Sequence, residues 1–275
     1  MHAALHEIRK IPPTALFGML VITLYIIVAV FAPILAPYGE SEIVAYEFEP
    51  WSSEYWLGTD SLGRDMATRM IYGARNTIGI ALITTLLAFF IGCVAAFLSA
   101  TLQGWVDQVI SRAVDVVISI PTLIFALLLL TILGTSVYSL IGVIALIYST
   151  FVFRIARAVA MGIVVMDYVE AARIRGEGLW WVMSREILPN AAPPLVAEFG
   201  LRFCFVFLTI SGLSFLGLGI QPPAADWGSM VRENASLITF GDLTPLIPAS
   251  AIGLLTVAVN FIVDWMLHKA SGLKD

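Results

Sequence analysis

The chain consists of long apolar runs separated by short polar segments. A helix needs about 20 mostly apolar residues to cross a bilayer, at a rise of about 1.5 Å per residue. The uncharged stretch 116–153 is too long for one span, so we expect it to break at Gly134-Thr135-Ser136. The strict apolar–polar alternation of a membrane β-barrel does not occur. Six segments are therefore expected to span the membrane: residues 15–37, 77–100, 113–133, 137–153, 195–216 and 246–267.

This pattern predicts an all-α integral membrane protein with six transmembrane helices. The first apolar run is longer than the core of a signal peptide, so we expect it to be retained. Residues 158–166 are apolar but too short to cross a bilayer, and we expect them to form a helix that lies against the protein. The expected parts are an N-terminal segment 1–14, a first transmembrane helix 15–37, a loop 38–76, a core of five helices at 77–267 and a C-terminal segment 268–275.

Composition agrees with the membrane assignment and excludes several functions. Hydrophobic residues make up 59% of the chain and charged residues 13%, against about 25% charged in a soluble domain. A net charge of −5 without a basic stripe argues against nucleic-acid binding. No P-loop motif and no nucleophile–base constellation occurs, which indicates a subunit with no enzymatic activity or cofactor of its own. Cys93 and Cys204 lie in apolar stretches and the histidines lie outside them, which argues against a metal site.

The distribution of lysine and arginine predicts the orientation, because cytoplasmic loops carry an excess of both residues. Four of them fall in the loops on the side away from the termini: Arg64, Arg69, Arg75 and Arg232. Ten fall on the side of the termini: Arg9, Lys10, Arg112, Arg154, Arg157, Arg173, Arg175, Arg185, Lys269 and Lys274. We therefore expect both termini in the cytoplasm and residues 38–76 outside it.

The largest predicted cytoplasmic loop, residues 154–194, has the pattern of a helix–turn–helix. We expect a helix at 167–175, a turn with positive φ at Gly176, and a second helix at 179–188 that Pro189 ends. On the residues alone, this unit is either a docking surface for a cytosolic partner or a generic hairpin at the membrane surface. Its motif residues are Glu170, Ala171, Ala172, Gly176, Ile187, Leu188 and Pro189.

These motif residues, in a basic loop before the fifth span, resemble the EAA coupling loop of ABC importer permeases. The resemblance implies that the helix–turn–helix sits in a groove of an ATPase subunit. It also implies the fold of a type I ABC importer permease. ATP and Mg²⁺ would then be bound by the partner ATPase subunits and not by this chain.

A second resemblance, over residues 60–265, is to the C-type permease subunits of the oligopeptide, dipeptide and nickel permease family. It implies a bacterial inner-membrane protein that works with a homologous second permease, two ABC ATPases and an extracytoplasmic solute-binding protein. Di- or oligopeptides are the expected substrate, with nickel, opines and oligosaccharides as alternatives. The resemblance is carried by motifs at 72–75, 106–107, 214–219 and 226–228 and by the outer segment with Gly58, Thr59, Asp60, Gly63, Arg64 and Asp65.

Charged residues of the outer segment are expected to fix its conformation. Asp60, Arg64, Asp65 and Arg69 can pair at helical spacing and hold a turn. Contact with substrate is the alternative role for these side chains.

Polar and ionisable residues in or near the spans are candidates for the translocation pathway. Glu198 and Arg202 lie at positions i and i+4, near the cytoplasmic end of the fifth predicted span. This spacing favours an ion pair that either gates the pathway or stabilises the fold. Hydrogen bonding between helices is an equally good explanation for the other candidates. The full set is Asp115, Glu198, Arg202, Asn260 and Asp264.

Two other kinds of membrane protein compete with this interpretation. An ion-coupled secondary transporter would carry buried acids near span centres and inverted repeats with broken helices. A membrane enzyme or scaffold would carry a cluster of catalytic or ligand residues. The charged residues here fall near the ends of the predicted spans, and neither alternative pattern is present.

The predicted orientation can be tested by cysteine accessibility. Single cysteines at Ser52 and Ser236 should react with a membrane-impermeant reagent from outside, because both lie in predicted outer loops. A cysteine at Ser184 should not react from that side. The opposite result at these positions would contradict the six-span arrangement.

Overall fold

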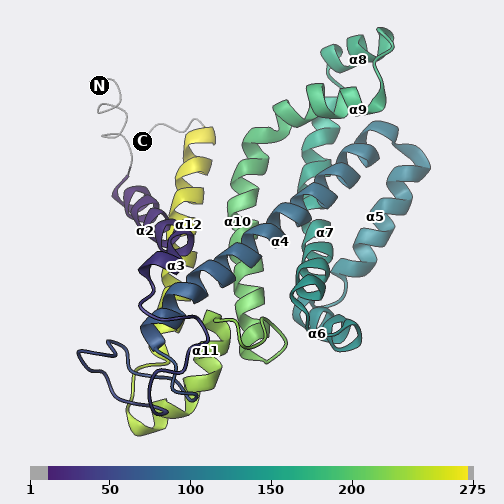
Figure 1. Cartoon of the computed structure of the whole chain (residues 1–275). Helices are drawn as coiled ribbons and strands as arrows, with labels where there is room; N and C mark the ends of the chain where they lie inside the picture. The colour runs from purple at the N-terminus through teal and green to yellow at the C-terminus, as the bar shows by residue number, and fades with distance from the viewer. Residues whose placement is uncertain (1–11, 272–275) are drawn as a thin grey trace, which may run out of the picture.

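The computed structural model describes residues 12–271, so residues 1–11 and 272–275 of the two expected terminal segments lie outside the described part. Within that part the chain is helical, with two isolated β-bridges and no strand (Figure 1). Helix α2 (Pro13–Val30) begins with a proline in its first turn, where a missing backbone N–H breaks no helical hydrogen bond. The short helix α3 (Ala32–Leu35) follows, and the two occupy the first predicted span.

Helix α4 (Met66–Leu102) is longer than the second predicted span, 77–100, and it corrects the expected loop 38–76. The Asp65 carboxylate accepts a hydrogen bond from the backbone N–H of Thr68 at 2.7 Å and so caps the helix. The first turns of α4 are polar, and hydropathy therefore did not assign them to the span. Only residues 36–65 form the irregular segment between α3 and α4.

The third predicted span, 113–133, is wrong as a single helix. Helix α5 (Gly104–Ile118) is followed after a short break by α6 (Thr122–Leu133), and the two are bent by 92°. Pro121 accounts for the break, because it has no N–H to donate and disfavours helical conformation in the residue before it. The pair forms an elbow at one end of the molecule (Figure 1).

The predicted break at Gly134-Thr135-Ser136 is confirmed, because α6 ends before it and α7 (Val137–Val164) begins after it. The Ser136 hydroxyl caps α7 by accepting a hydrogen bond from the N–H of Ser139 at 3.1 Å. Helix α7 also runs through most of the segment 158–166, which was expected to form a separate helix. That segment is too short to cross a bilayer alone, but here it extends a helix that already does.

The remaining helices begin at the predicted coupling loop. Their bounds are α8 (Asp167–Ile174), α9 (Leu179–Trp181), the π-helix η1 (Val182–Ile187), α10 (Leu188–Phe215), α11 (Trp227–Asn234), the 3₁₀ helix η2 (Ala235–Phe240) and α12 (Leu246–Ser271). The helical path is continuous over Leu179–Phe215, so the expectation that Pro189 ends a short helix is wrong. Pro189 lies in the first turn of α10, and the wider π-helical turns before it remove the i to i−4 bond that a proline cannot make.

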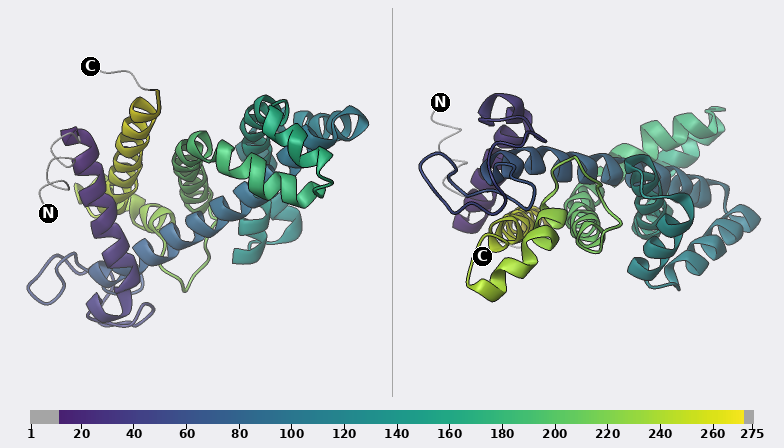
Figure 2. Two further views of the ribbon diagram at one scale, coloured as in Figure 1. Left: turned by 90° about the horizontal axis from the view of Figure 1, so that it is seen from above. Right: turned by 60° about the horizontal axis from the view of Figure 1, so that its bottom comes forward.

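Five of these helices are long and apolar enough to cross a membrane, or six if the bent α5–α6 pair counts as one span. This agrees with the predicted all-α membrane fold. Helix α4 crosses the molecule obliquely, with α2 and α12 at one end of it and α5 at the other (Figures 1 and 2). The coupling loop projects at the end opposite to α11 (Figure 1).

Buried apolar side chains form two separate clusters. The α11 cluster draws on α4, α6, α7, α10, α11 and α12, and includes Met66, Leu130, Ile144, Phe207 and Trp227. The α8 cluster lies at the other end and includes Phe97, Val114, Phe153, Val169 and Ile187 from α4, α5, α7, α8 and η1. Helices α4, α7 and α10 contribute to both clusters, whereas the coupling loop packs only into the second.

Trp227 attaches α11 to the membrane helices. Its indole is 2% exposed and donates a hydrogen bond to the carbonyl of Met70 on α4 at 3.0 Å. The ring packs edge-on against Tyr25 of α2 and Phe207 of α10, with centroids 5.5 and 6.4 Å apart. Gly73 leaves the room for it, since a Cβ there would lie 2.7 Å from the indole. One side chain therefore joins four helices.

Replacement of Trp227 by alanine should destabilise the protein strongly. Loss of a buried tryptophan costs about 3–5 kcal/mol, because the cavity adds to the lost transfer free energy. We expect a clearly lower thermal unfolding midpoint for the detergent-purified protein. Trp105→Ala is the matched control, because Trp105 is 75% exposed, and it should leave the midpoint nearly unchanged.

Candidate functional site

The coupling loop folds as two helical segments around a sharp turn at Gly176. After α8, the N–H of Gly176 donates to the carbonyl of Arg173 at 3.0 Å, and the N–H of Glu177 donates to that of Ala172 at 3.2 Å. Gly176 has φ of +85°, which places it in the left-handed region that closes many helix C-termini. A Cβ at this position would meet nothing within 4 Å. Within this chain, glycine is therefore favoured at position 176 by the backbone conformation and not by steric crowding.

The motif residues of this loop divide into a buried and an exposed set. Ala172 and Ile187 are fully buried, and Ile187 packs in the α8 cluster with Val169 of α8. The exposed motif residues are Glu170, Ala171, Gly176, Leu188 and Pro189. The loop is thus fixed from within, while the rest of the motif is accessible to a partner.

Two large apolar side chains extend the exposed surface at the tip of the loop. Ile174 is 80% exposed and Trp180 is 66% exposed. Sequence reasoning missed Ile174, although an isoleucine beside arginines in a polar loop is a recognisable signal. Nearby, the Arg175 guanidinium lies 5.8 Å from the Trp181 ring centroid, which stiffens the second segment.

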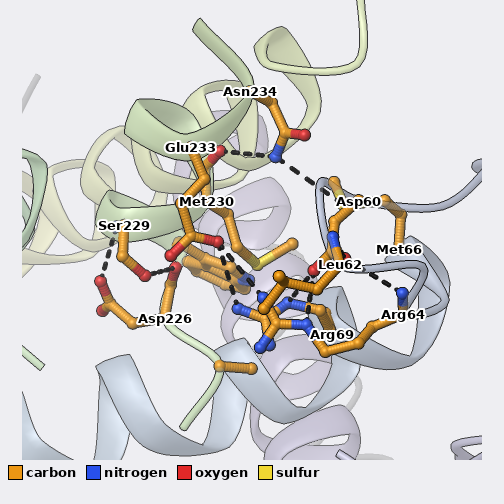
Figure 3. A network of polar contacts seen from close by, with 12 residues as sticks. Asp60, Leu62, Arg64, Met66, Arg69, Asp226, Ser229, Met230, Glu233 and Asn234 are labelled. Atoms are coloured by element: carbon orange, nitrogen blue, oxygen red, sulfur yellow. Dashed lines mark hydrogen bonds and ion pairs between the residues drawn. The ribbon is translucent and has the colours of Figure 1, made fainter. Parts of the chain in front are cut away.

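The outer segment contains a buried cluster of charges (Figure 3). Asp60 forms ion pairs with Arg64 at 2.7 Å and with Arg69 at 3.1 Å. Glu233 of α11 lies 3.5 Å from Arg64 and 3.6 Å from Arg69. Asp60 and Arg64 pair at the expected spacing of four residues, although they lie before α4 and not in a helix. Asp65 caps α4, and Arg69 pairs with Asp60 and not with Asp65. Glu233 was not identified from the sequence, since it comes from a segment far along the chain.

Other residues of the outer segment also have structural contacts. The Thr59 hydroxyl donates to the carbonyl of Tyr46 at 2.7 Å and accepts from the N–H of Glu49 at 2.8 Å. Gly58 and Gly63 both have positive φ in tight turns. Asp60 is fully buried and Arg69 is 1% exposed. This burial favours a role in fixing the segment over direct contact with substrate.

Asp226 is another buried acid at this end of the molecule. Its carboxylate caps α11 by accepting from the N–H of Ser229 at 2.8 Å, and it accepts from the Thr77 hydroxyl on α4 at 2.9 Å. Burial raises the pKa of the Asp226 carboxyl, and the hydrogen bonds from Ser229 and Thr77 oppose that rise. Asp226 and Trp227 together bind α11 to α4.

Glu198 and Arg202 form an ion pair on α10, at 2.6 Å between Arg202 Nη2 and Glu198 Oε1. The Arg202 guanidinium also lies 5.2 Å from the ring centroid of Phe151 on α7 and 5.5 Å from that of Phe205. The pair is mostly buried and lies between α10 and α7. Both the gating and the stabilising roles fit this geometry.

The other pathway candidates are not brought together. The Asn260 amide donates to the carbonyl of Thr256 on its own helix at 2.9 Å and lies 3.9 Å from the Cys204 sulfur on α10. Asp264 and Asp115 are exposed. Within residues 12–271, no ion pair joins Asp115 to Arg112 of the same helix.

Comparison with known proteins decides the family. Residues 88–269 match the family described as the inner membrane component of binding-protein-dependent transport systems. The chain belongs to this family. Residues 12–49 of the permease also match the N-terminal transmembrane domain of oligopeptide transport permease C. Both the coupling-loop resemblance and the C-type resemblance thus led to the correct family, and the chain is a permease subunit of an ABC importer.

Curated relatives align with nearly the whole permease. The glutathione transport system permease protein GsiD of Pectobacterium atrosepticum is 32% identical over 258 residues, covering 93% of this chain and 83% of that protein. The dipeptide transport system permease protein DppC of Alkalihalophilus pseudofirmus is 30% identical, covering 95% and 84%. The probable D,D-dipeptide transport system permease protein DdpC of Escherichia coli is 32% identical, covering 92% and 85%.

The permease also resembles a solved structure in its fold. A chain of an amino acid ABC transporter crystallised with histidines matches with a TM-score of 0.54 at 20% identity, over 72% of this chain and 92% of that one. The ion-coupled transporter and the membrane enzyme considered above are not favoured by any of these matches.

A double-mutant comparison should reveal how the Glu198–Arg202 pair contributes. Removal of one partner strands a mostly buried charge, which costs about 3–5 kcal/mol. Arg202→Ala should therefore reduce the yield of folded permease more than Glu198→Ala combined with Arg202→Ala does. Asp264→Ala, at an exposed acid, is the control. Single and double variants that all match the wild type would mean that the pair contributes little.

Proposed function

We propose that this permease forms half of the translocation pathway of an ATP-driven importer for di- or oligopeptides. The names of its relatives support the substrate class, since several transport peptides, and glutathione is itself a small peptide. Its partners are a homologous second permease, two ABC ATPases that bind ATP and Mg²⁺, and an extracytoplasmic solute-binding protein. The permease itself performs no covalent chemistry.

The proposed location is the bacterial inner membrane, with both termini in the cytoplasm. The arginines of the coupling loop support this orientation, because positive charge accumulates on the cytoplasmic side. The start of α2 and the end of α12 lie at the same end of the molecule as α8, which is consistent with termini on that side (Figure 1).

The shape of the coupling loop is the observation that carries the coupling role. It presents exposed apolar side chains, Ile174 and Trp180, next to the exposed Glu170, on a base that the α8 cluster holds firmly. An amphipathic helix with exposed anchors is suited to a groove on a partner protein. Binding of ATP by the partner ATPase would displace the loop. The loop would make different contacts with the ATPase in the two states of the transporter, and this difference would switch access to the pathway.

The peptide assignment can be tested by uptake. Proteoliposomes that contain the assembled complex should accumulate radiolabelled di- or oligopeptide only with ATP inside and with the cognate binding protein outside. Nickel, an opine and an oligosaccharide serve as competing substrates in the same assay. Preferential uptake of any of these three would overturn the peptide assignment but not the coupling role.

Substitution of Gly176 should uncouple the complex without unfolding it. A leucine in the left-handed region costs about 1–2 kcal/mol, and the distorted tip would no longer fit a groove. We expect Gly176→Leu to remove most of the ATP hydrolysis that the loaded binding protein stimulates. Glu170→Ala should have a milder effect, because it removes a charge and leaves the turn intact.

Gly178→Leu is the matched control. Gly178 lies two positions further on, is also open to solvent, and has φ of −71°, which leucine adopts without strain. It should retain more stimulated ATPase activity than Gly176→Leu, while co-purification with the second permease stays intact in both. Full stimulated activity in Gly176→Leu would remove the coupling assignment.

A further inference from the structure

A single carboxylate joins three helices at the base of the coupling loop. Asp107 lies in the first turn of α5, and its two oxygens accept hydrogen bonds from Arg157 Nε and Nη2 of α7, each at 2.5 Å. The same carboxylate accepts a hydrogen bond from the Ser99 hydroxyl on α4, and another from Ser111 on α5 at 3.3 Å. Two parallel bonds from a guanidinium fix orientation as well as distance.

The position of this contact links two parts of the structure. Arg157 is on the last turns of α7, which lead directly into α8 and the coupling loop. Asp107 follows the tight turn between α4 and α5, where Gln103 and Gly104 both have positive φ. The pair therefore connects the α4–α5 hairpin to the helix that carries the loop.

Helices α5 and α6 extend this connection to the other end of the molecule. Val114 of α5 belongs to the α8 cluster, whereas Ala126 and Leu130 of α6 belong to the α11 cluster. The elbow at 119–121 lies between them. Helix α6 therefore connects α5 to side chains that pack beside the far ends of α7 and α10.

Apolar packing holds α5 along one side only. Val114 is buried, and Ile110 and Ile118 are partly buried against the α8 cluster, whereas Trp105, Val109 and Val116 are exposed. The bonds at Asp107 add a directional contact between α5 and α7. A second contact at this base is the bond from Arg173 Nη2 of α8 to the carbonyl of Thr101 on α4, at 3.4 Å.

We propose that Asp107 and Arg157 are a positioning pair that makes the α4–α5 hairpin move together with the coupling loop. When the loop is displaced, the pair moves α5 with it, and the elbow between α5 and α6 transmits this movement to α6. The proposal rests on the coupling role proposed above. It predicts that loss of the pair lowers the number of substrate molecules moved per ATP hydrolysed, while ATP hydrolysis itself continues, because the loop still docks.

The test uses the complete complex in proteoliposomes with loaded binding protein, and measures uptake and ATP hydrolysis in the same sample. In Asp107→Asn, uptake per ATP should fall at least about fivefold, the lower end of coupling between linked sites. Arg157→Gln should behave alike, and the double variant should be no worse than either single one. Asp107→Glu should recover part of the loss. Arg112→Gln, at an exposed arginine of α5, is the charge-matched control and should leave the ratio unchanged.

The ratio separates positioning from a purely structural role. A variant that only destabilised the fold would lower uptake and ATP hydrolysis together, and an unchanged ratio in Asp107→Asn would overturn the proposal. If Asp107→Asn does not assemble, Ser99→Ala decides: a lowered ratio supports the proposal and an unchanged ratio overturns it. A wild-type complex without stimulated ATP hydrolysis would instead contradict the proposed coupling role.

Discussion

The close approach of other helices to α4 is the packing interaction on which the rest of the structure depends. Lipid is as apolar as the side chains of a membrane helix, so helices associate through tight packing and not through removal of apolar surface from water. Small buried residues run along α4, namely Ala74, Ala81, Ala88, Gly92 and Ala96. At Gly92 a Cβ would lie 2.6 Å from the carbonyl oxygen of Ser149 on α7, so only glycine allows this contact. The α4–α7 pair is the frame that passes through both apolar clusters.

Polar side chains also attach α11 and α5 to the α4–α7 frame. At the α11 end, Asp226 and Glu233 attach α11 to the start of α4 by buried hydrogen bonds and ion pairs. At the opposite end, Asp107 attaches α5 to α7. In both places charge-assisted bonds supplement the apolar packing of the segment, and because they are directional they define one geometry.

Local features of the fold were predictable from the sequence, and contacts between distant segments were not. The break before α7 and the turn at Gly176 follow from residues whose backbone preferences act within a few positions. Pro189 misled the prediction, because its usual effect on a helix is avoided by π-helical turns that hydropathy and propensity do not reveal. Tertiary structure alone brings together two ion pairs, Glu233–Arg69 and Asp107–Arg157. Each of these residues alone looked like an ordinary loop or helix-end charge.

The two clusters bear on the coupling role proposed above, in which a partner contacts only one end of the subunit. The coupling loop packs together with the ends of α4 and α7, because Val169 and Ile187 are buried with Phe97 and Phe153. In the proposed coupling role, a displaced loop would therefore displace these helices too. They also pack into the α11 cluster, where Trp227 and the charged residues hold the opposite end of the subunit. Helices α2 and α12 contact the frame near that far end and approach each other closely at Gly18, so they can serve as an anchor against which the frame moves.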